Sequence, residues 1–508
     1  MRNSFEELIR KKVYQLLLIF PIYLSLGDLD FTFRLLAVYF FINIFASYYS
    51  NQPLRETRVY RVSLWERVKL NPAQLVILSF SLLIVFGTVL IMTPLAHKES
   101  LNLDFIDALF MATSATCVTG LSTFSIGEEL TLFGQVCMLV LIQVGGLGIM
   151  TLTSSMTILL GRTMGMKDQI LMKGLLDISS FEELVSMILE IIKLTLMIEF
   201  WGAILLSGAF LYEGQEIGEA LFNGIFHSIS AFCNAGFSLF PNSLELYKTN
   251  VFVNFVVVAL IVFGGLGFFV IKDLRENFKK KGFKGLSLHS KIVLYANFFL
   301  IILGTFSFFF SEFLNVLDSY SLSEKMLISF FQSITTRTAG FNTISFEGLH
   351  SQTIYFIALL MFVGASPGST GGGIKTTTFA LLMQSVKASL MRRKQVEFFN
   401  RKISHQLSVR ATAIFIISLT IVSLFLLMLV KVEKDIPFLS LFFETISAFG
   451  TVGLSLGITP DLGPVGKALI IGLMFIGRVG PFTLVLAFTK LKTVPDKVQF
   501  AEGRVMIG

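Results

Sequence analysis

Four segments of the chain repeat one pattern, and this repeat limits the folds that the chain can adopt. In each segment a phenylalanine is followed ten residues later by a glycine, then by leucine or phenylalanine, then by serine or asparagine. Repetition of this kind indicates that one structural unit is built several times along the chain. The segments are 110–122 (FMATSATCVTGLS), 226–238 (FHSISAFCNAGFS), 330–342 (FFQSITTRTAGFN) and 443–455 (FETISAFGTVGLS).

Long apolar runs surround these segments. Of the 508 residues, 54% are hydrophobic and 15% are charged, whereas a typical soluble domain has about 25% charged residues. A helix needs about 20 apolar residues to cross a bilayer, so the chain is predicted to be an integral membrane protein, although 13–27 is short for a span. The predicted spans are 13–27, 31–49, 73–93, 133–160, 184–211, 251–271, 292–311, 353–385, 409–431 and 466–489.

Shorter apolar stretches lie between alternate spans, at 104–116, 218–232, 324–336 and 437–449. They are too short to cross a bilayer, and a re-entrant helix fits their length. The predicted fold is therefore an all-α integral membrane protein with four membrane–pore–membrane repeats around one central pore, after an N-terminal hydrophobic hairpin. The predicted divisions are 1–52 for the hairpin, 53–175, 176–285 and 286–400 for the first three repeats, and 401–508 for the fourth repeat and the C-terminal tail.

Basic residues cluster in the loops on one side of the predicted spans. The segments 272–291 and 387–410 are rich in lysine and arginine, whereas the opposite loops carry mostly acidic residues. The positive-inside rule places the basic loops and both termini in the cytoplasm. We therefore expect a multi-pass protein of the cell inner membrane. Because the charge of +7 lies between apolar runs, a nucleic-acid partner is not expected.

The residues around each repeated glycine suit a selectivity filter. Backbone carbonyls that replace water around a cation require a backbone off helical geometry, and glycine permits positive φ. Four such loops could surround one axis, although helix packing through small residues is an alternative reading. The predicted filter residues are Val118, Thr119, Gly120, Asn234, Ala235, Gly236, Thr338, Ala339, Gly340, Thr451, Val452 and Gly453.

The filter segments, the paired GGLG motifs at 145–148 and 264–267, and SPGSTGGGIKT at 366–376 resemble the Trk/Ktr/HKT superfamily of potassium transporters, most closely its KtrB membrane subunits. The resemblance covers about residues 70–490. It implies K⁺ as the transported ion, Na⁺ as an activator in some members, and no covalent cofactor. It also implies a homodimer and a cytoplasmic nucleotide-binding ring (KtrA/TrkA-like), through which alone ATP, ADP or NAD would act. In plant relatives, serine at the first filter glycine is associated with Na⁺ selectivity, and Gly120 therefore favours K⁺.

The third repeat carries a predicted gate. Pro367 and four glycines within 367–373 cannot hold a regular helix, so the span should break into two short helices joined by a loop that faces the pore. A nucleotide P-loop is disfavoured because Ile374 stands where its lysine must be. The resemblance implies that this loop is the gate. The predicted gate residues are Gly364, Ser366, Gly368, Ser369, Thr370, Gly371, Gly372, Gly373, Lys375 and Arg478.

Four of the charged residues in or beside the predicted membrane segments are candidates for a specific role. Arg337 is expected to brace the filter from behind, with Glu444 as a candidate partner that would offset its burial. Arg478 precedes a predicted break at Gly480 and is expected to hold the gate loop. Glu199 lies in the middle of a span, where a buried hydrogen-bond partner is preferred over an ion relay.

Two other functions compete with a K⁺ pore. A Na⁺ or non-selective monovalent cation transporter of the same architecture remains the alternative to a K⁺ pore. An enzyme would need an acid/base or metal cluster at a membrane interface, and the sequence contains none, so catalytic residues are not expected.

Overall fold

The computed structural model describes residues 72–98, 101, 103–159, 181–346, 348–393 and 395–488. The chain divides into two units, 1–69 and Leu70–Gly508, and all the described residues lie in the second. The predicted hairpin at 1–52 lies outside the described residues.

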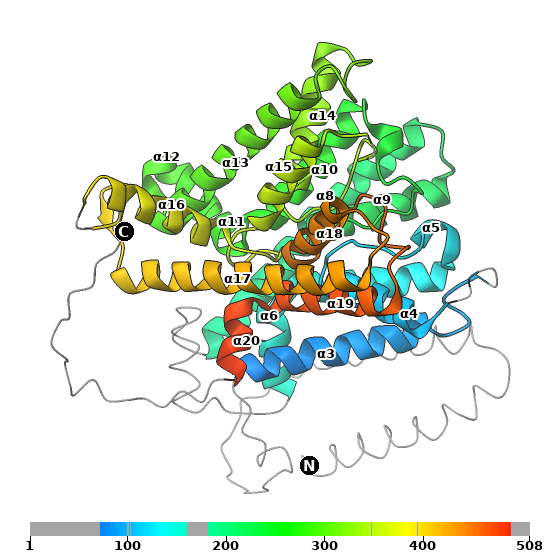
Figure 1. The fold of residues 1–508 in the computed structure, drawn as a ribbon, viewed down its shortest axis with the longest axis horizontal. Coiled ribbons are helices and arrows are strands. Elements are labelled where there is room, and N and C mark those ends of the chain that lie inside the picture. The colour runs from blue at the N-terminus through cyan, green and yellow to red at the C-terminus, as the bar shows by residue number, and fades with distance from the viewer. Residues whose placement is uncertain are drawn as a thin grey trace, which may run out of the picture. The chain divides into compact units, whose positions relative to one another are not determined.

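The described chain repeats one order of helices four times (Figure 1). A long helix comes first, and α3 (Pro72–Ile91), α8 (Phe181–Tyr212), α13 (Leu288–Glu312) and α17 (His405–Val432) fill this place. A shorter helix follows, and these are α4 (Phe105–Thr116), α9 (Ile217–Phe232), α14 (Leu322–Thr335) and α18 (Phe438–Gly450). Within the described residues, four helices are long and apolar enough to cross a membrane, or six if each bent pair is one span.

The short helices are buried at the ends that lead into the repeated glycines. The phenylalanine that begins each repeated segment accounts for part of this packing, because Phe110, Phe226 and Phe443 are fully buried. In the third segment the next residue, Phe331, takes this role with 1% of its surface exposed. The long helices instead expose many large apolar side chains, which suits contact with lipid.

The helix that closes each unit is interrupted. In α6 (Leu132–Leu159) the break lies at Gly148 with φ 85°. Between α10 (Val251–Leu266) and α11 (Phe268–Asp273) it lies at Gly267, with a bend of 101°. Between α19 (Pro464–Val479) and α20 (Pro481–Phe488) the bend is 89°. In the third unit, α15 (Ser351–Phe362) and α16 (Thr376–Leu390) are separated by 363–375.

Two of these breaks differ from the sequence prediction. The runs 133–160 and 251–271 are expected as single spans, yet Gly148 and Gly267 adopt positive φ and end the regular helix there. The breaks at 363–375 and at Gly480 agree with the prediction.

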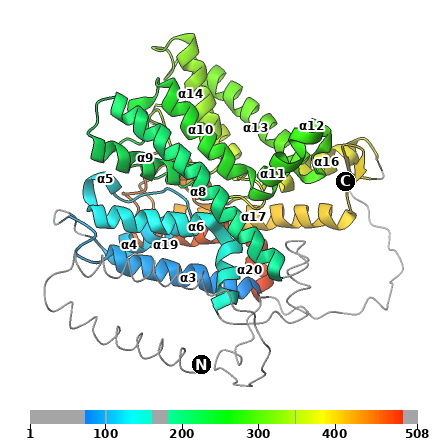
Figure 2. The ribbon, with the colours of Figure 1, turned by 180° about the vertical axis from the view of Figure 1, so that it is seen from behind.

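The remaining elements are small. They are α5 (Ile126–Glu129), the 3-10 turn η2 (Glu245–Tyr247), the π-turn η3 (Leu274–Phe278), α12 (Lys279–Gly285), and the antiparallel strands β1 (Glu397–Phe398) and β2 (Arg401–Lys402). The two opposite views place α12 and α16 together at one end of the helices and α5 at the other (Figures 1 and 2). The basic segments around α12 and after α16 therefore share an end.

Candidate ion pathway

Each short helix leads into a loop with the same unusual backbone. In all four loops the motif glycine and the residue two positions before it have positive φ, a region that costs an L-residue other than glycine about 1–2 kcal/mol. Its recurrence indicates that the surroundings impose it, and the non-helical backbone expected here is present. The angles are Val118 56°, Gly120 96°, Asn234 58°, Gly236 70°, Thr338 66°, Gly340 77°, Thr451 50° and Gly453 92°.

The four glycines form a closed ring in which each loop touches the next. A Cβ atom built onto each glycine would clash with the neighbouring loop, because real Cβ atoms essentially never lie within 3.0 Å of another such heavy atom. The distances from such a Cβ are 2.5 Å from Gly120 to Ala235 O, 2.7 Å from Gly236 to Gly340 Cα, 2.5 Å from Gly340 to Val452 O, and 2.2 Å from Gly453 to Thr119 O. The loops therefore surround one axis in chain order.

A cavity of about 400 Å³ opens above this ring, and all four glycines line it. We call this cavity the funnel. Its wall also includes Ile126, the first residue of α5, and residues of the segments that follow each glycine, such as Leu121 and Leu454. The twelve predicted filter residues therefore lie at or next to the floor of one shared funnel.

Serine hydroxyls brace three of the loops, and these serines are not among the predicted site residues. Ser114 accepts from Gly120 N at 3.1 Å and donates to Leu121 O at 2.6 Å. Ser230 donates to Phe237 O at 2.7 Å, and Ser447 accepts from Gly453 N at 3.1 Å. The third repeat has Ile334 at the aligned position, six residues before its glycine. There the Thr335 hydroxyl braces the loop instead, by donating to Phe341 O. A serine six residues before the glycine in three aligned segments was the available signal.

The predicted gate loop lies directly beneath the ring. Gly372 N donates to Thr451 Oγ1 at 3.0 Å, and the Thr370 hydroxyl donates to Phe232 O at 3.2 Å. A Cβ on Gly371 would lie 2.0 Å from Thr338 Oγ1. The loop therefore contacts the second, third and fourth filter segments.

The two ends of the gate loop are also tied. Gly364 N donates to Ile374 O at 2.9 Å, which closes the loop at its base. Lys375 Nζ donates to Gly371 O at 2.7 Å. Gly368 O accepts from Phe268 N at 3.0 Å, and the Ser369 hydroxyl donates to Ser366 O at 2.6 Å. Gly373 has φ 68° and sits against Gly364 and Gly450.

Arg478 joins three repeats at this loop. It lies at the end of α19, and its guanidinium donates to Thr370 O in the gate loop and to Gly145 O in α6. The side chain is buried, with 6% of its surface exposed. A guanidinium can donate in several directions at once, so one residue of the fourth repeat holds carbonyls of the first and third.

Arg337 and Glu444 form hydrogen bonds with different residues and not with each other. Arg337 donates to Asn297 Oδ1 at 2.7 Å, and Asn297 Nδ2 in turn donates to the Ser366 hydroxyl at 3.1 Å. Glu444 accepts from the Thr459 hydroxyl. Among the described residues no ion pair joins Arg337 to Glu444. The arginine is thus linked to the gate loop, and the glutamate to the segment after the fourth glycine.

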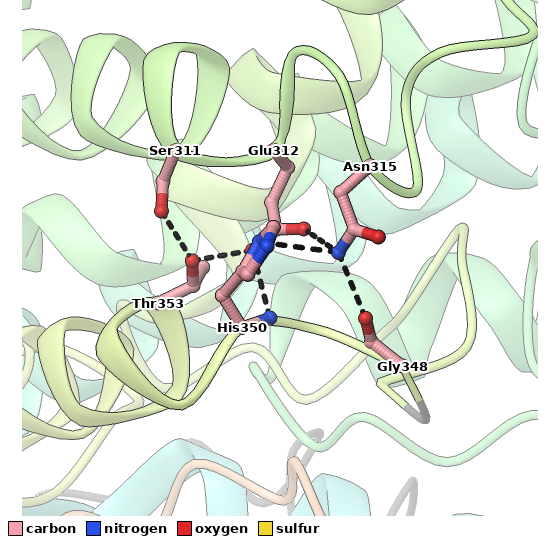
Figure 3. Close-up of polar contacts among 6 residues, drawn as sticks. All are labelled: Ser311, Glu312, Asn315, Gly348, His350 and Thr353. Atoms are coloured by element: carbon pink, nitrogen blue, oxygen red, sulfur yellow. Dashed lines mark hydrogen bonds and ion pairs between the residues drawn. The ribbon is translucent and has the colours of Figure 1, made fainter.

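Two further buried carboxylates lie outside the ring. Glu199 accepts from Gln143 Nε2 at 3.1 Å, as expected for a buried hydrogen-bond partner, and contacts Cys233 Sγ at 3.8 Å. Glu312, which is not among the predicted site residues, lies at the end of α13, and its side chain is fully buried. Figure 3 shows its polar contacts. It accepts from His350 N at 3.1 Å and from Asn315 Nδ2 at 2.6 Å.

These helices and loops define a helical membrane protein of the transporter class. A family model described as "Cation transport protein", TrkH, matches residues 59–498. The chain therefore belongs to the TrkH family of cation transport proteins, as the sequence motifs predict.

Similar proteins support this placement. The chain is 39% identical to Ktr system potassium uptake protein B of Bacillus subtilis, over 87% of this chain and 98% of that protein. It is 36% identical to potassium/sodium uptake protein NtpJ of Enterococcus hirae, over 87% of this chain and 98% of that protein. The crystal structure of TrkH from Vibrio parahaemolyticus matches with a TM-score of 0.65 and 20% identity, over 85% of this chain and 87% of that one. That match shows a shared fold.

Proposed function

We propose that the chain carries K⁺ across the cell membrane through a filter formed by the four glycine loops. The observation that carries the proposal is the closed ring of Gly120, Gly236, Gly340 and Gly453 with positive φ in every loop. Such a backbone turns carbonyl oxygens toward one axis, where they can replace the water around a monovalent cation. The proposed ion contacts are the twelve filter residues named above.

Each unit is then a membrane–pore–membrane repeat, with divisions at 53–175, 176–285, 286–400 and 401–508. The long helices supply the spans, and the short helices re-enter the membrane and end at the filter. A backbone without helical hydrogen bonding is tolerated at membrane depth where it lines a water-filled path.

The choice of K⁺ rests on glycine at all four filter positions and on the relatives. Two of the similar proteins are named for potassium uptake or potassium/sodium uptake. The second name supports an alternative, in which the same pore carries Na⁺ or monovalent cations without strong preference. Uptake measured separately in K⁺ and Na⁺ decides between them, and equal rates would favour the alternative.

The loop 364–373 is the proposed gate. It lies under the filter and is held by Arg478, Lys375 and Thr451. Release of these hydrogen bonds would let the loop leave the axis. Because Arg478 is positively charged and buried beside the loop, it would also oppose passage of a cation.

Regulation and assembly follow from the resemblance to two-component Ktr systems. We propose that a cytoplasmic nucleotide-binding ring opens the gate, that the chain works as a homodimer, and that both termini face the cytoplasm of the inner membrane. Nucleotide would act only through that partner, and Na⁺ could act as an activator. The basic segments 272–291 and 387–410 are the proposed docking side for the ring.

Gly340→Ser tests the filter. The φ of 77° and the 2.5 Å approach to Val452 O leave no room for a side chain, so we expect K⁺ uptake in a K⁺-uptake-deficient strain to fall at least about tenfold, the equivalent of ~1.4 kcal/mol. Gly348→Ser is the matched control, because Gly348 has φ 84° in the same repeat with nothing within 4 Å. Equal uptake by the two variants would refute the proposed filter.

A further inference from the structure

We propose that a small anion of the size of chloride binds beside the Arg337 guanidinium, behind the third filter loop, and acts there as its counter-ion. The anion site itself does not depend on the proposed pore. Its effect on K⁺ flux does rest on the proposed function, because Arg337 directly precedes the filter residues Thr338, Ala339 and Gly340.

Arg337 is a buried charge that has no carboxylate partner in the described part of the chain. Only 6% of its surface is exposed, and none of the ion pairs between described residues includes it. Glu444, the expected partner, accepts from the Thr459 hydroxyl instead. Buried charges are normally paired, because an unpaired charge loses its hydration without compensation. Arg337 therefore requires a negative charge that these side chains do not supply.

The hydrogen bonds of the guanidinium leave two of its nitrogens without an acceptor. Nη2 donates to Asn297 Oδ1 at 2.7 Å. Nε and Nη1 are buried and have no hydrogen-bond partner among the described residues. Asn297 is itself held in place, because its Nδ2 donates to Val293 O at 2.8 Å and to the Ser366 hydroxyl at 3.1 Å. A guanidinium carries donors only, so the missing partner must be an acceptor.

A small cavity of about 20 Å³ provides room for such an acceptor, and Arg337 and Asn297 both line it. The rest of its wall consists of Gly265, Ala365 and aliphatic side chains of α10, α13 and α14. Among the described residues of this wall there is no carboxylate. About 10–15 Å³ is enough for one water molecule. The cavity therefore admits one or two small groups and excludes a large organic anion.

The charge of the site favours a halide over water as the occupant. Either could accept from Nε or Nη1, but water would leave the positive charge in place. The C-terminus of α14, two residues before Arg337 at Thr335, supplies roughly half a negative charge and so offsets the guanidinium only in part. A halide supplies a full negative charge and accepts hydrogen bonds from any direction.

An anion at this site would change the electric field at the filter. A positive charge one residue before Thr338 opposes a cation on the filter axis, and such interactions are strong in the interior of a protein. A bound anion neutralises this charge. K⁺ and the anion should then each favour the binding of the other, because the coupling between two sites is reciprocal.

The first test measures binding of the anion without any flux. The purified full chain in detergent is unfolded by heat in potassium chloride, potassium bromide or potassium gluconate at equal ionic strength. We expect midpoints in chloride and bromide about 2–4 °C above the midpoint in gluconate, which is too large for the cavity. Equal midpoints in all three salts would overturn the proposal, because water would then suffice at Arg337.

Two variants locate the effect in the chain. Arg337→Gln removes the charge and keeps an amide that can donate to Asn297 Oδ1, and we expect its midpoint to be the same in chloride and gluconate. Arg410→Gln is the matched control and should keep the wild-type shift. Arg410 is exposed, lies over the Phe482 ring and does not line the cavity. A chloride shift that persists in Arg337→Gln would overturn the proposal.

Bromide in crystals of the wild-type chain gives a second readout, which holds even if Arg337→Gln does not fold. We expect an anomalous scattering peak beside the guanidinium, in the cavity between α10 and α13. A data set without a peak at that place would overturn the site.

The effect on transport is measured as K⁺ influx into proteoliposomes with the same anion on both sides. We expect influx through the wild type to be at least about fivefold lower in gluconate than in chloride, and influx through Arg337→Gln to be equal in the two. Equal wild-type influx in both anions would overturn the effect on the filter. A wild type without influx in either anion would refute the pore, whereas the midpoint shift would still report the anion site, so the two failures are distinguishable.

Discussion

At the scale of single residues, Glu312 shows how a buried charge can fasten two helices (Figure 3). Its carboxylate at the end of α13 accepts from the backbone N of His350 and from the Thr353 hydroxyl, both at the start of α15. Asn315 donates to the other carboxylate oxygen at 2.6 Å. Removal of the acceptor would leave these donors unsatisfied, which is more costly than the loss of an ordinary hydrogen bond.

We therefore expect Glu312→Ala to lower the free energy of unfolding by about 2–4 kcal/mol. The measurement is the midpoint of thermal unfolding of the purified protein in detergent. Glu219→Ala is the control, since Glu219 is exposed in α9, and its midpoint should match wild type. A Glu312→Ala midpoint that also matches wild type would contradict the interpretation.

Arg478 is the residue at which the gate proposal is most directly tested. Arg478→Ala removes the donors to Thr370 O and Gly145 O and also removes a buried positive charge below the filter. We expect K⁺ flux to rise about fivefold or more, the equivalent of ~1 kcal/mol. We also expect regulation of the flux to weaken. Flux through Arg410→Ala should be unchanged, because Arg410 is exposed and lies over the Phe482 ring. Unchanged uptake kinetics in Arg478→Ala would remove it from the gate.

The partners of Arg337 and Glu444 mark a limit of sequence reasoning at this scale. The sequence places both residues near filter glycines, and burial then demands hydrogen bonds. It does not determine which helices meet behind each loop. Arg337 reaches Asn297 on α13, and Glu444 reaches Thr459 beyond the fourth glycine. Helical periodicity relates residues within one helix, whereas these contacts depend on packing between helices.

At the scale of elements, Gly267 is the hinge between α10 and α11. Its φ is 92°, and a Cβ there would lie 2.5 Å from Pro367 O in the gate loop. Phe268 N, the next residue, donates to Gly368 O at 3.0 Å. Both the backbone conformation and the packing of the gate loop therefore require glycine.

We expect Gly267→Ala to destabilise the protein by about 2–3 kcal/mol, of which ~1–2 kcal/mol comes from the left-handed backbone. Thermal unfolding in detergent is the measurement. Gly208→Ala in α8 is the control. Nothing lies within 4 Å of its added Cβ, and alanine is more favourable than glycine in a helix by about 0.8–1 kcal/mol. Equal midpoints for the two variants would contradict the proposed hinge.

The helix breaks show which features of an element can be predicted. The gate loop is predictable, since Pro367 and its neighbouring glycines exclude a helix. The breaks at Gly148 and Gly267 are not predicted, because a glycine inside an apolar run is compatible with a continuous membrane helix. The strands β1 and β2 are missed as well, since two-residue strands in a charged segment give no periodic signal.

At the scale of the whole molecule, the repeat predicts four loops, and the structure adds their order. Gly120 contacts the second loop, Gly236 the third, Gly340 the fourth, and Gly453 returns to the first. Consecutive units are therefore neighbours, as short connections favour. The unequal roles of the units appear only in contacts between repeats, such as those of Arg478 and Thr370.

The orientation of the molecule gives the last prediction. The funnel lies at the end near α5, and the basic segments lie at the opposite end near α12 and α16 (Figures 1 and 2). The positive-inside rule then predicts that the funnel faces the outside of the cell. Asn242 lines the funnel and Lys402 lies on β2, and both are exposed.

We expect a membrane-impermeant maleimide to label Asn242→Cys in intact cells, and Lys402→Cys only after the cells are permeabilised. Wild type is a suitable control, because Cys117, Cys137 and Cys233 are all buried and should react little. A difference of about tenfold between the two variants in intact cells is the expected result, since a bilayer excludes the charged reagent. Labelling of Lys402→Cys in intact cells, with protection of Asn242→Cys, would show the opposite orientation. In that case the basic segments could not dock a cytoplasmic ring.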